Sequence, residues 1–418
     1  MTIQTSTHHR WRRLAKLTLF LALLTSFFWL YPGIMDLVHQ STAGAVDASL
    51  DVTGRQITSW EASAFKYFHG RHRSGVLGEF RKRLMEEHAL AIDQETMIAM
   101  QDRTSSGILP AANTLARNGW IGLYDGGFPH SVEGVERLEI DTGLRFHVLA
   151  FYQAWGDRQE HRFPWNLCHA ISLLGSIPMI TWEPWVTEFD QQRHDLHPLP
   201  DRQYRSLRAI ADGEYDFFIE AWATDAAEYG EPLFLRFAHE MNNVARYPWS
   251  PEYGNRPEDF VDAWRHVRQI FHWAGADQVI WVWSPHAARE IEPYYPGDEW
   301  VDWVGTVCLN YGTEVHWSQW WTFEELFDNA YDFFDTTGKP VMIAEFATLT
   351  GGGEAVQWYE DAFSAITRRY PRVRMIVLFH QQLDTTVTPH PLDWSFDQSP
   401  WVKQLMMDRL GTFIMPAG

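Results

Sequence analysis

Cysteine is scarce in this sequence: the chain of 418 residues contains only Cys168 and Cys308. The first lies in an apolar, helix-like run and the second in an apolar, strand-like run. Two cysteines cannot build the multiple cross-links that hold small disulfide-rich domains together. We therefore expect two buried, reduced thiols and no disulfide framework.

Basic residues are also in deficit. The chain has 34 Lys and Arg against 54 Asp and Glu, which gives a formal net charge of −20. Binding to nucleic acid depends on clustered Lys and Arg side chains that contact the phosphates. The composition therefore argues against a nucleic-acid partner and suits an exported domain that acts on a neutral polymer.

The sequence lacks solenoid-type repeats and low-complexity tracts, but it has one long apolar stretch near its start. The uncharged run from Leu17 to Met35 is close to the ~20 residues that cross a bilayer. A basic cluster between residues 10 and 16 precedes it and should stay cytoplasmic, which places the chain after Asp36 outside the cytoplasm. We favour an uncleaved anchor; the alternative is a signal sequence cleaved near Ala43-Gly44-Ala45.

These features divide the chain into three parts. We expect residues 1–36 to form the cytoplasmic tip and the transmembrane anchor or signal sequence, and residues 37–115 to form a stalk or packing segment without a recognisable motif. Residues 116–418 form the expected main domain. The predicted location is the inner membrane facing the periplasm or cell exterior, or the outside if the N-terminus is cleaved.

Aromatic residues, by contrast, are abundant: they make up 15% of the chain, and 22 residues are Trp. Trp is poorly suited to routine core filling because it is large and its indole N–H needs a partner. We interpret this abundance mainly as flat apolar platforms for sugar rings, with aromatic-rich core packing as the alternative.

From Gly119 to Gln381, short apolar runs alternate with amphipathic stretches that have helical spacing. Eight runs have the length of buried strands: Trp120–Tyr124, Phe146–Phe151, Ile177–Trp182, Leu233–Phe237, Val279–Trp283, Val301–Leu309, Val341–Ala344 and Val373–Phe379. Pro257 at the start of one helical stretch and Gly230 at the end of another are typical boundary residues. The pattern predicts an α/β fold, a (β/α)8 TIM barrel. A doubly wound open sheet is the alternative, although the first run is not followed by a glycine-rich dinucleotide turn.

Two carboxylates follow apolar runs at matching ends: Glu240 after the fourth run and Glu345 after the seventh. In a parallel barrel the carboxyl ends of all strands meet at one mouth, where active sites form. Glycoside hydrolysis needs a pair of carboxyl groups flanking one bond, one as proton donor and one as nucleophile or base. For each Glu taken alone, the alternative is a salt-bridged residue at a strand end.

The residues around both carboxylates resemble those of glycoside hydrolase family 26, the β-mannanase-like family of clan A. Five stretches carry the resemblance in the expected order: IPMITWEPW, DGEYDFFIEAWATDAAEYG, LRFAHEMNN with the following YPWS, YYPGDEWVDWVGTVCLNYG and PVMIAEFA. The resemblance covers the chain from about Asn118 to the C-terminus. It implies a barrel with catalytic glutamates on strands four and seven, and a retaining double displacement with Glu240 as acid/base and Glu345 as nucleophile.

The resemblance also implies supporting roles. His239 is similar to a sugar-contacting histidine, Asn242 is expected to bond a ring hydroxyl or the acid, and Tyr311 is expected to donate a hydrogen bond to the nucleophile. Three tryptophans are candidate stacking platforms for the substrate: Trp182, Trp249 and Trp394.

The chain departs from the family pattern around the expected sugar subsites. Asn243–Arg246 intervenes before the next aromatic residue, Asn310 stands where many members have Asp, and no Trp follows Phe379 at the tip of the eighth run. The substrate therefore stays open among β-mannan, mixed-linkage β-glucan, β-1,3-xylan and an exopolysaccharide.

We accordingly expect an exported, membrane-anchored endo-β-glycanase that needs no cofactor, with polysaccharide synthesis machinery as a candidate partner. The first alternative is a non-catalytic polysaccharide-binding barrel of an exopolysaccharide export system. The second is a metal-dependent hydrolase, which would need several converging ligands. His147 within the second run and His380 directly after the eighth are the only additional strand-associated histidines, so we expect no metal site.

Overall fold

The computed structural model describes residues 119–127, 132–199 and 201–414. The predicted anchor (1–36) and stalk (37–115) lie outside these residues. Within the described ranges, none of the helices combines the length and apolar character needed to cross a membrane.

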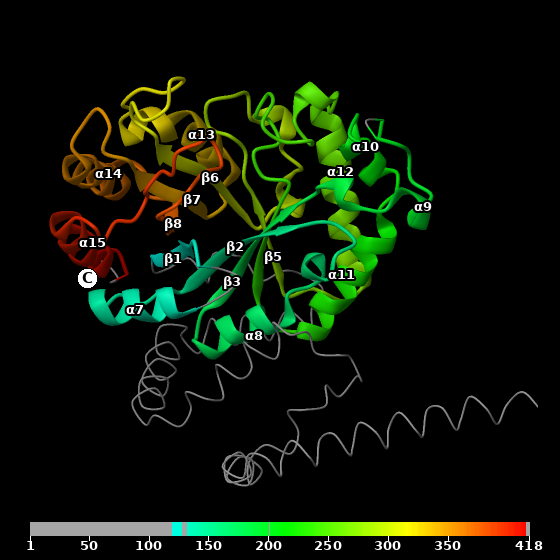
Figure 1. Ribbon diagram of the computed structural model, residues 1–418, viewed down its shortest axis with the longest axis horizontal. Helices are drawn as coiled ribbons and strands as arrows, with labels where there is room; N and C mark the ends of the chain where they lie inside the picture. Colours follow the sequence, from blue (N-terminus) through cyan, green and yellow to red (C-terminus); the bar gives the residue numbers. More distant parts are fainter. Residues whose placement is uncertain (1–118, 128–131, 200, 415–418) are drawn as a thin grey trace, which may run out of the picture. The chain divides into compact units, whose positions relative to one another are not determined.

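Eight parallel strands close into a barrel in which each strand pairs with its neighbours in sequence and β1 pairs with β8 (Figure 1). The strands are β1 (Trp120–Asp125), β2 (Val148–Ala154), β3 (Ile177–Glu183), β4 (Leu233–Phe237), β5 (Val279–Trp283), β6 (Trp303–Asn310), β7 (Val341–Thr348) and β8 (Val373–His380). The predicted barrel is confirmed, and the open doubly wound sheet is excluded because β1 and β8 are hydrogen-bonded to each other.

Helices surround the barrel (Figure 1). They are α7 (Glu133–Thr142), α8 (Trp165–Leu173), α9 (Gln191–His194), α10 (Ser206–Ala211), α11 (Asp216–Tyr229), α12 (Pro257–Trp273), α13 (Phe323–Thr337), α14 (Ala355–Arg369) and α15 (Pro400–Ile414). Short 3-10 turns lie at η1 (Gln159–His161), η2 (Val186–Glu188), η3 (Pro251–Tyr253), η4 (Glu292–Tyr294) and η5 (Asp298–Trp300). Gly230 ends α11 with a φ of 70°, a left-handed conformation that glycine adopts without steric strain. Cys168 and Cys308 are buried free thiols, as predicted.

Side chains at alternate strand positions fill the barrel interior. They are Trp120, Val148, Ala150, Ile177, Met179, Phe234, Ile280, Val282, Trp303, Met342, Ala344, Met375 and Val377. Because successive residues of a strand point to opposite faces, the same alternation directs Tyr152, Thr181, Glu183 and Arg236 inward at the carboxyl ends of β2, β3 and β4. Polar side chains thus lie beyond the apolar layers, at the carboxyl-terminal end of the barrel.

Strand β7 departs from strict alternation just before its polar residue. Ala344 belongs to the interior cluster, so regular alternation would point Glu345 outward. The pairing register of β7 shifts around Ile343 against both β6 and β8. Such irregularities re-aim side chains next to active sites, and Glu345 accordingly reaches Arg236 inside the barrel.

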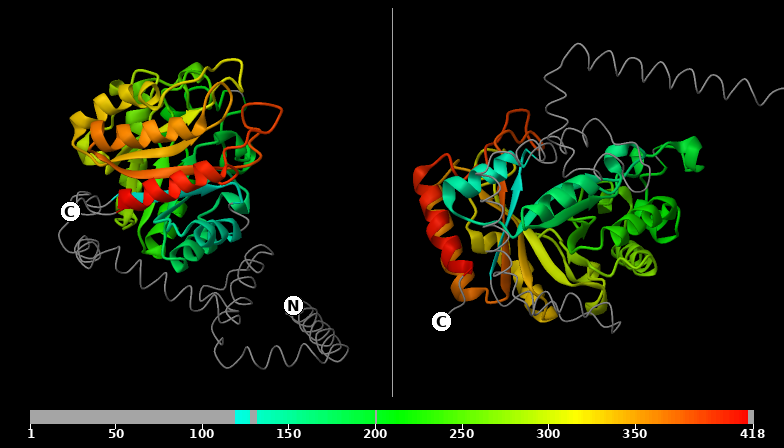
Figure 2. Two further views of the ribbon diagram at one scale, coloured as in Figure 1. Left: turned by 90° about the vertical axis from the view of Figure 1, so that its left-hand side faces the viewer. Right: turned by 90° about the horizontal axis from the view of Figure 1, so that it is seen from below.

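A second, smaller apolar cluster covers one side of the mouth. Its buried members are Val315, Ala347, Leu349, Phe379, Leu392 and Trp394, and Tyr124, Leu309, Tyr311 and Val387 pack against them. The loop after β8, drawn in orange-red, supplies Leu392 and Trp394 and projects from the body of the barrel (Figure 2). This cluster gives the mouth a packed wall beside β6, β7 and β8.

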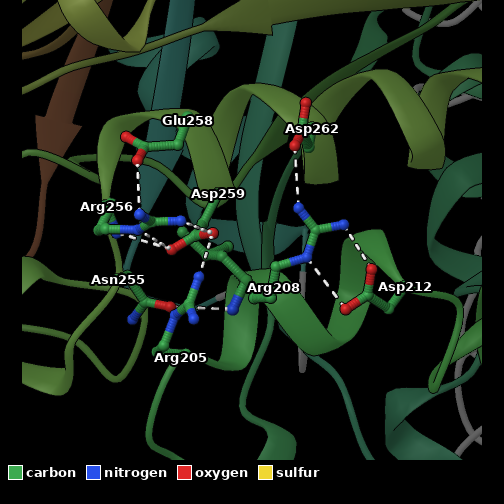
Figure 3. Close-up of polar contacts among 9 residues, drawn as sticks. Arg205, Arg208, Asp212, Asn255, Arg256, Glu258, Asp259 and Asp262 are labelled. Atoms are coloured by element: carbon green, nitrogen blue, oxygen red, sulfur yellow. Dashed lines mark hydrogen bonds and ion pairs between the residues drawn. The ribbon is translucent and has the colours of Figure 1, made fainter.

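The long connection between β3 and α11 is fastened to α12 by ion pairs (Figure 3). Arg205 donates a hydrogen bond from Nη2 to Oδ1 of the buried Asp259 (2.8 Å), and Arg256 contacts the same carboxylate. Arg208 donates to Asp262 on α12 (2.9 Å). The ion pairs therefore hold the part of this connection that contains α10 against α12.

Candidate active site

Two donors converge on one oxygen of Glu345. The Tyr152 hydroxyl donates to Oε1 (2.6 Å), and Nη2 of Arg236 donates to the same atom (2.6 Å). Glu345 is 6% exposed and Arg236 is 1% exposed, so the ion pair lies inside the protein. Charge-assisted hydrogen bonds of this kind are short and orient a carboxylate strongly.

Arg236 is held from a second side as well. Its Nε donates to the Thr181 hydroxyl (2.9 Å), and its guanidinium lies 5.8 Å from the centre of the Tyr152 ring. Burial alone would lower the pKa of Arg236, but Glu345 and Tyr152 raise it above its usual value. The guanidinium therefore stays charged beside the Glu345 carboxylate.

Glu240 lies just beyond β4 and is 7% exposed. Its backbone has a φ of 52°, and its N–H donates to the Ser284 carbonyl after β5 (2.8 Å). The side-chain amide of Asn243 donates to Oε2 of Glu240 (3.1 Å). The side-chain hydrogen-bond donor to Glu240 is thus neutral, whereas Glu345 has a cationic donor; the charged group nearby Glu240 is Arg246.

Tyr311 lies in the loop after β6, near enough to both carboxylates to feel their charge. Burial raises the pKa of Tyr311 above its usual value, and the nearby Glu240 and Glu345 carboxylates add to the increase.

Tyr311 was expected to hydrogen-bond the nucleophile, but Tyr152 on β2 occupies that place. The Tyr311 ring instead packs edge-on against Trp394 (4.8 Å between centroids) and beside Trp317 (5.0 Å). The structure thus shows Tyr152, at an inward position of β2, as a tyrosine donor to Glu345, and the expected Tyr311 contact stays a prediction.

His239 is 2% exposed, and its Nε2 forms a hydrogen bond with the Tyr247 hydroxyl (2.9 Å). Burial lowers the pKa of His239 well below its usual value, and the charges of Arg236 and Arg246 lower it further. The imidazole is therefore neutral at pH 7. Its predicted sugar contact stays a prediction.

Asn242 does not have the expected role. Its side-chain N–H groups donate to the carbonyls of His286 and Glu290 (3.0 Å each), and its Oδ1 accepts from the His286 N–H (2.7 Å). These bonds occupy the amide and fasten the loop after β5. The next residue, Asn243, contacts Glu240 instead.

The three predicted stacking platforms are wrong, because all are buried. Trp182 is 0% exposed: alternation on β3 points it outward, where it packs against Trp155 and Trp222. Trp249 is 0% exposed beneath the stacked Tyr247 ring, and Trp394 is 1% exposed in the wall of the mouth.

Trp317 is an accessible tryptophan beside Tyr311. It is 55% exposed, and it lies in the loop between β6 and α13. No strand pattern marks this position, because the side chain belongs to a loop. Tyr152 and Arg236 did carry a signal: each is a polar interruption on the inward face of an apolar strand.

Among the described residues, no three His, Cys, Asp or Glu side chains lie close enough together to hold a metal ion. His147, one of the two strand histidines considered as a ligand, accepts a hydrogen bond at Nδ1 from the Ile121 N–H (3.2 Å). His380 lies 3.8 Å from Asp397 at the end of β8.

Several known proteins are similar to this chain in sequence or in fold. Residues 177–371 match the family described as Glycosyl hydrolase family 26. The chain is 34% identical over 291 residues to Endoglucanase H of Acetivibrio thermocellus, a match that covers 67% of this chain and 29% of that protein. It is 24% identical over 235 residues to a mannan endo-1,4-beta-mannosidase of Bacillus subtilis, covering 51% of this chain and 58% of that one.

The solved structure of a GH26 beta-mannanase from Bacteroides ovatus has the same fold, with a TM-score of 0.52 at 14% identity. The match covers 76% of this chain and 92% of that one. The chain spans less than two thirds of the length of the two curated relatives named above. The family match includes β3 through β7, and with them both carboxylates of the mouth. The chain belongs to glycosyl hydrolase family 26.

Proposed function

We propose that this protein is a retaining endo-β-glycanase in which Glu345 is the nucleophile and Glu240 the acid/base. The observation that carries the proposal is the different environment of the two carboxyl groups. Glu345 accepts hydrogen bonds from the cationic Arg236 and the Tyr152 hydroxyl, whereas Glu240 accepts one from the neutral Asn243 amide and has the Arg246 charge nearby. Carboxyl groups whose surroundings differ in this way take different roles in acid and base chemistry.

The proposed reaction has two displacements. Glu345 attacks the anomeric carbon while Glu240 gives its proton to the glycosidic oxygen, so the leaving sugar departs as an alcohol. Glu240, now ionised, then takes a proton from water as that water attacks the same carbon. This second step releases Glu345 as a carboxylate and returns the product with its original anomeric configuration.

The proposed substrate is a β-linked, largely neutral polysaccharide. The similar proteins are named as an endoglucanase and a mannan endo-1,4-beta-mannosidase. These names support a β-glucan or a β-mannan, and an exopolysaccharide with such linkages fits equally well. The net charge of −20 disfavours a strongly anionic polymer.

The test compares the parent protein with Glu345→Ala and Glu240→Ala on β-mannan, mixed-linkage β-glucan, cellulose and β-1,3-xylan. We expect each variant to lose more than ~10³-fold in kcat. Azide should partly rescue both and separate their roles: Glu345→Ala should give the α-glycosyl azide and Glu240→Ala the β-glycosyl azide. Glu220→Ala, an exposed position on α11, is the matched control and should keep full activity.

Two outcomes would overturn this assignment. Equal activity of Glu345→Ala and the parent would exclude Glu345 as the nucleophile. Binding of polymer without new reducing ends in the parent would favour the non-catalytic polysaccharide-binding alternative.

We further propose that the domain works outside the cytoplasm, tethered by residues 17–35 and close to polysaccharide synthesis machinery. The apolar run and the basic cluster before it support this placement. Membrane fractions washed with alkaline carbonate should retain the full chain, and a protease added to spheroplasts should digest its barrel. Release of the chain by the wash, or protection of the barrel, would contradict the proposal.

A further inference from the structure

A third carboxyl group, Glu183, lies at the mouth and has no part in the reaction described above. It is the last residue of β3, and strand alternation directs it inward on the same face as Thr181, the partner of Arg236. It is therefore a neighbour of the Arg236–Glu345 pair.

Hydrogen bonds to the backbone carbonyl and to one carboxyl oxygen hold Glu183 in position. The indole N–H of Trp185 donates to Oε2 (3.0 Å), and the backbone N–H groups of Trp155 and Trp185 both donate to the Glu183 carbonyl (2.9 and 2.8 Å). The Glu183 side chain is only 14% exposed. A carboxyl group held in this way loses little conformational entropy when it binds a ligand.

The other carboxyl oxygen, Oε1, has no hydrogen-bond donor among the described residues, and Nδ1 of the neutral His239 is 4.0 Å away. That distance is too long for a hydrogen bond. A buried or half-buried carboxyl oxygen without a donor is unfavourable, so a donor from a bound ligand would stabilise it.

The charge state of Glu183 suits contact with a neutral hydroxyl. Burial raises the pKa of Glu183 to about 7; Trp185 and Arg236 oppose the increase, and Glu345 adds to it. Near neutral pH the group therefore exists in both forms. The ionised form accepts a hydrogen bond from a hydroxyl, and the protonated form can also donate one.

We propose that Glu183 is a specificity-determining residue whose Oε1 binds a hydroxyl group of the sugar unit held against Glu345. This inference rests on the proposed glycanase function and extends it, since it identifies a β3 residue as part of the sugar site. Trp185 is the positioning residue that keeps Oε2 in place, so that Oε1 faces the sugar.

The experiment measures kcat and KM of Glu183→Gln, Glu183→Ala and Trp185→Phe on the polysaccharide that the parent cleaves best. A hydrogen bond to a charged group corresponds to a loss of about 10- to 100-fold in kcat/KM for Glu183→Ala. Glu183→Gln, which keeps an acceptor, should lose less, and Trp185→Phe should fall between the parent and the Ala variant. Glu188→Gln, further along the same connection and exposed, is the matched control and should match the parent.

Two further readouts separate sugar contact from a structural role. The pH profile of kcat/KM in the parent should contain an apparent pKa near 7 that disappears in Glu183→Gln. In the Glu345→Gln background, where hydrolysis is blocked, Glu183→Ala should weaken the Kd for a tetrasaccharide of the same polymer by at least about tenfold.

Unchanged kcat/KM, pH profile and Kd in Glu183→Gln and Glu183→Ala would overturn the inference. If Glu183→Ala fails to fold, Glu183→Gln and Trp185→Phe decide the question with the same readouts. If the parent cleaves none of the polysaccharides, the proposed function fails, and the Kd measurement still tests Glu183 by itself.

Discussion

At the scale of single residues, Arg236 is a buried cation that serves two acceptors at once. Nε reaches the Thr181 hydroxyl and Nη2 reaches Glu345, because the guanidinium is a rigid planar fork. The ammonium of a lysine is a single point and cannot lie at both places. The geometry of Glu345 therefore depends on arginine in particular and not on positive charge alone.

We predict that Arg236→Lys lowers kcat by about 10- to 100-fold, with a smaller change in KM. The reason is that the carboxylate keeps a cation nearby but loses its orientation. Reducing-end assays over a range of substrate concentrations measure both constants, and Arg158→Lys on the exposed surface serves as the control. An Arg236→Lys enzyme with the kcat of the parent would show that the orientation of Glu345 does not matter.

Glu139 on α7 gives a prediction about stability and pH. It is 3% exposed, and burial raises its pKa to about 7, against a hydrogen bond from the Phe146 N–H and the charge of Arg145. Between pH 4.5 and 7 the folded protein keeps a proton that the unfolded chain has lost, so this group lowers stability as the pH rises.

We expect the parent to lose about 2–3 kcal/mol more than Glu139→Gln in free energy of unfolding between pH 5 and pH 8. Urea unfolding of both proteins at the two pH values measures the difference. Parallel pH dependence in the two proteins would mean that Glu139 is ionised in the fold.

Part of the mouth could be predicted from single positions, and part could not. Glu240 and Glu345 attract attention because each is charged and follows an apolar run. Arg236 interrupts its apolar run and so carries a similar signal, but nothing in the run assigns a role to it. The partner of Arg236 is far away in sequence, and no local pattern reveals a contact between β4 and β7.

At the scale of elements, the loop between β6 and α13 is held by one side chain at its base. Oδ1 of Asn310 accepts the backbone N–H groups of Gly312 and Trp321 (3.2 Å each), which lie at the two ends of the loop. Asn310 is completely buried. Its departure from the family's usual Asp is thus compatible with an acceptor that fastens the loop bearing Tyr311 and Trp317.

We predict that Trp317→Ala raises KM for the polysaccharide by about 5- to 10-fold and leaves kcat within twofold. An exposed aromatic ring contributes on the order of 1 kcal/mol to a stacked contact and lies away from the two carboxylates. Steady-state kinetics test this, and Trp401→Ala, a more exposed Trp on α15, is the control. Equal KM values in the two variants would exclude Trp317 from the substrate path.

Strands and helices were the most predictable elements. Leu233–Phe237 and Val279–Trp283 have the predicted bounds, and α12 begins at the predicted Pro257. The register shift around Ile343 was not predictable, because it depends on pairing with β6 and β8. The buried tryptophans were misjudged for a related reason: composition does not tell which face of a strand a residue occupies.

For the whole molecule, the net charge of −20 sets an electrostatic condition on the substrate. We predict that hydrolysis of a neutral β-glucan changes less than about twofold between 0.01 M and 1 M NaCl. A carboxymethylated form of the same glucan should be cleaved slowly at low salt and faster at high salt, since the screening length falls from about 30 Å to about 3 Å. Faster cleavage of the charged polymer at low salt would indicate a basic substrate path.

At Glu240, the stability of the fold and the activity of the site favour different residues. Its φ of 52° is left-handed, and a side chain costs about 1–2 kcal/mol there. We therefore expect Glu240→Gly to have a free energy of unfolding about 1 kcal/mol higher than that of the parent, and thus a higher urea midpoint. The variant should no longer hydrolyse polysaccharide. Ala238→Gly relieves a similar strain (φ 46°) and should keep hydrolysis, so activity and urea midpoint together separate the two effects.

A lower midpoint for Glu240→Gly would show that the left-handed backbone is not strained by the glutamate. The expected result means that selection for thermal stability alone would favour glycine at position 240. Such selection would turn the enzyme into a lectin, which binds its polysaccharide without cleaving it.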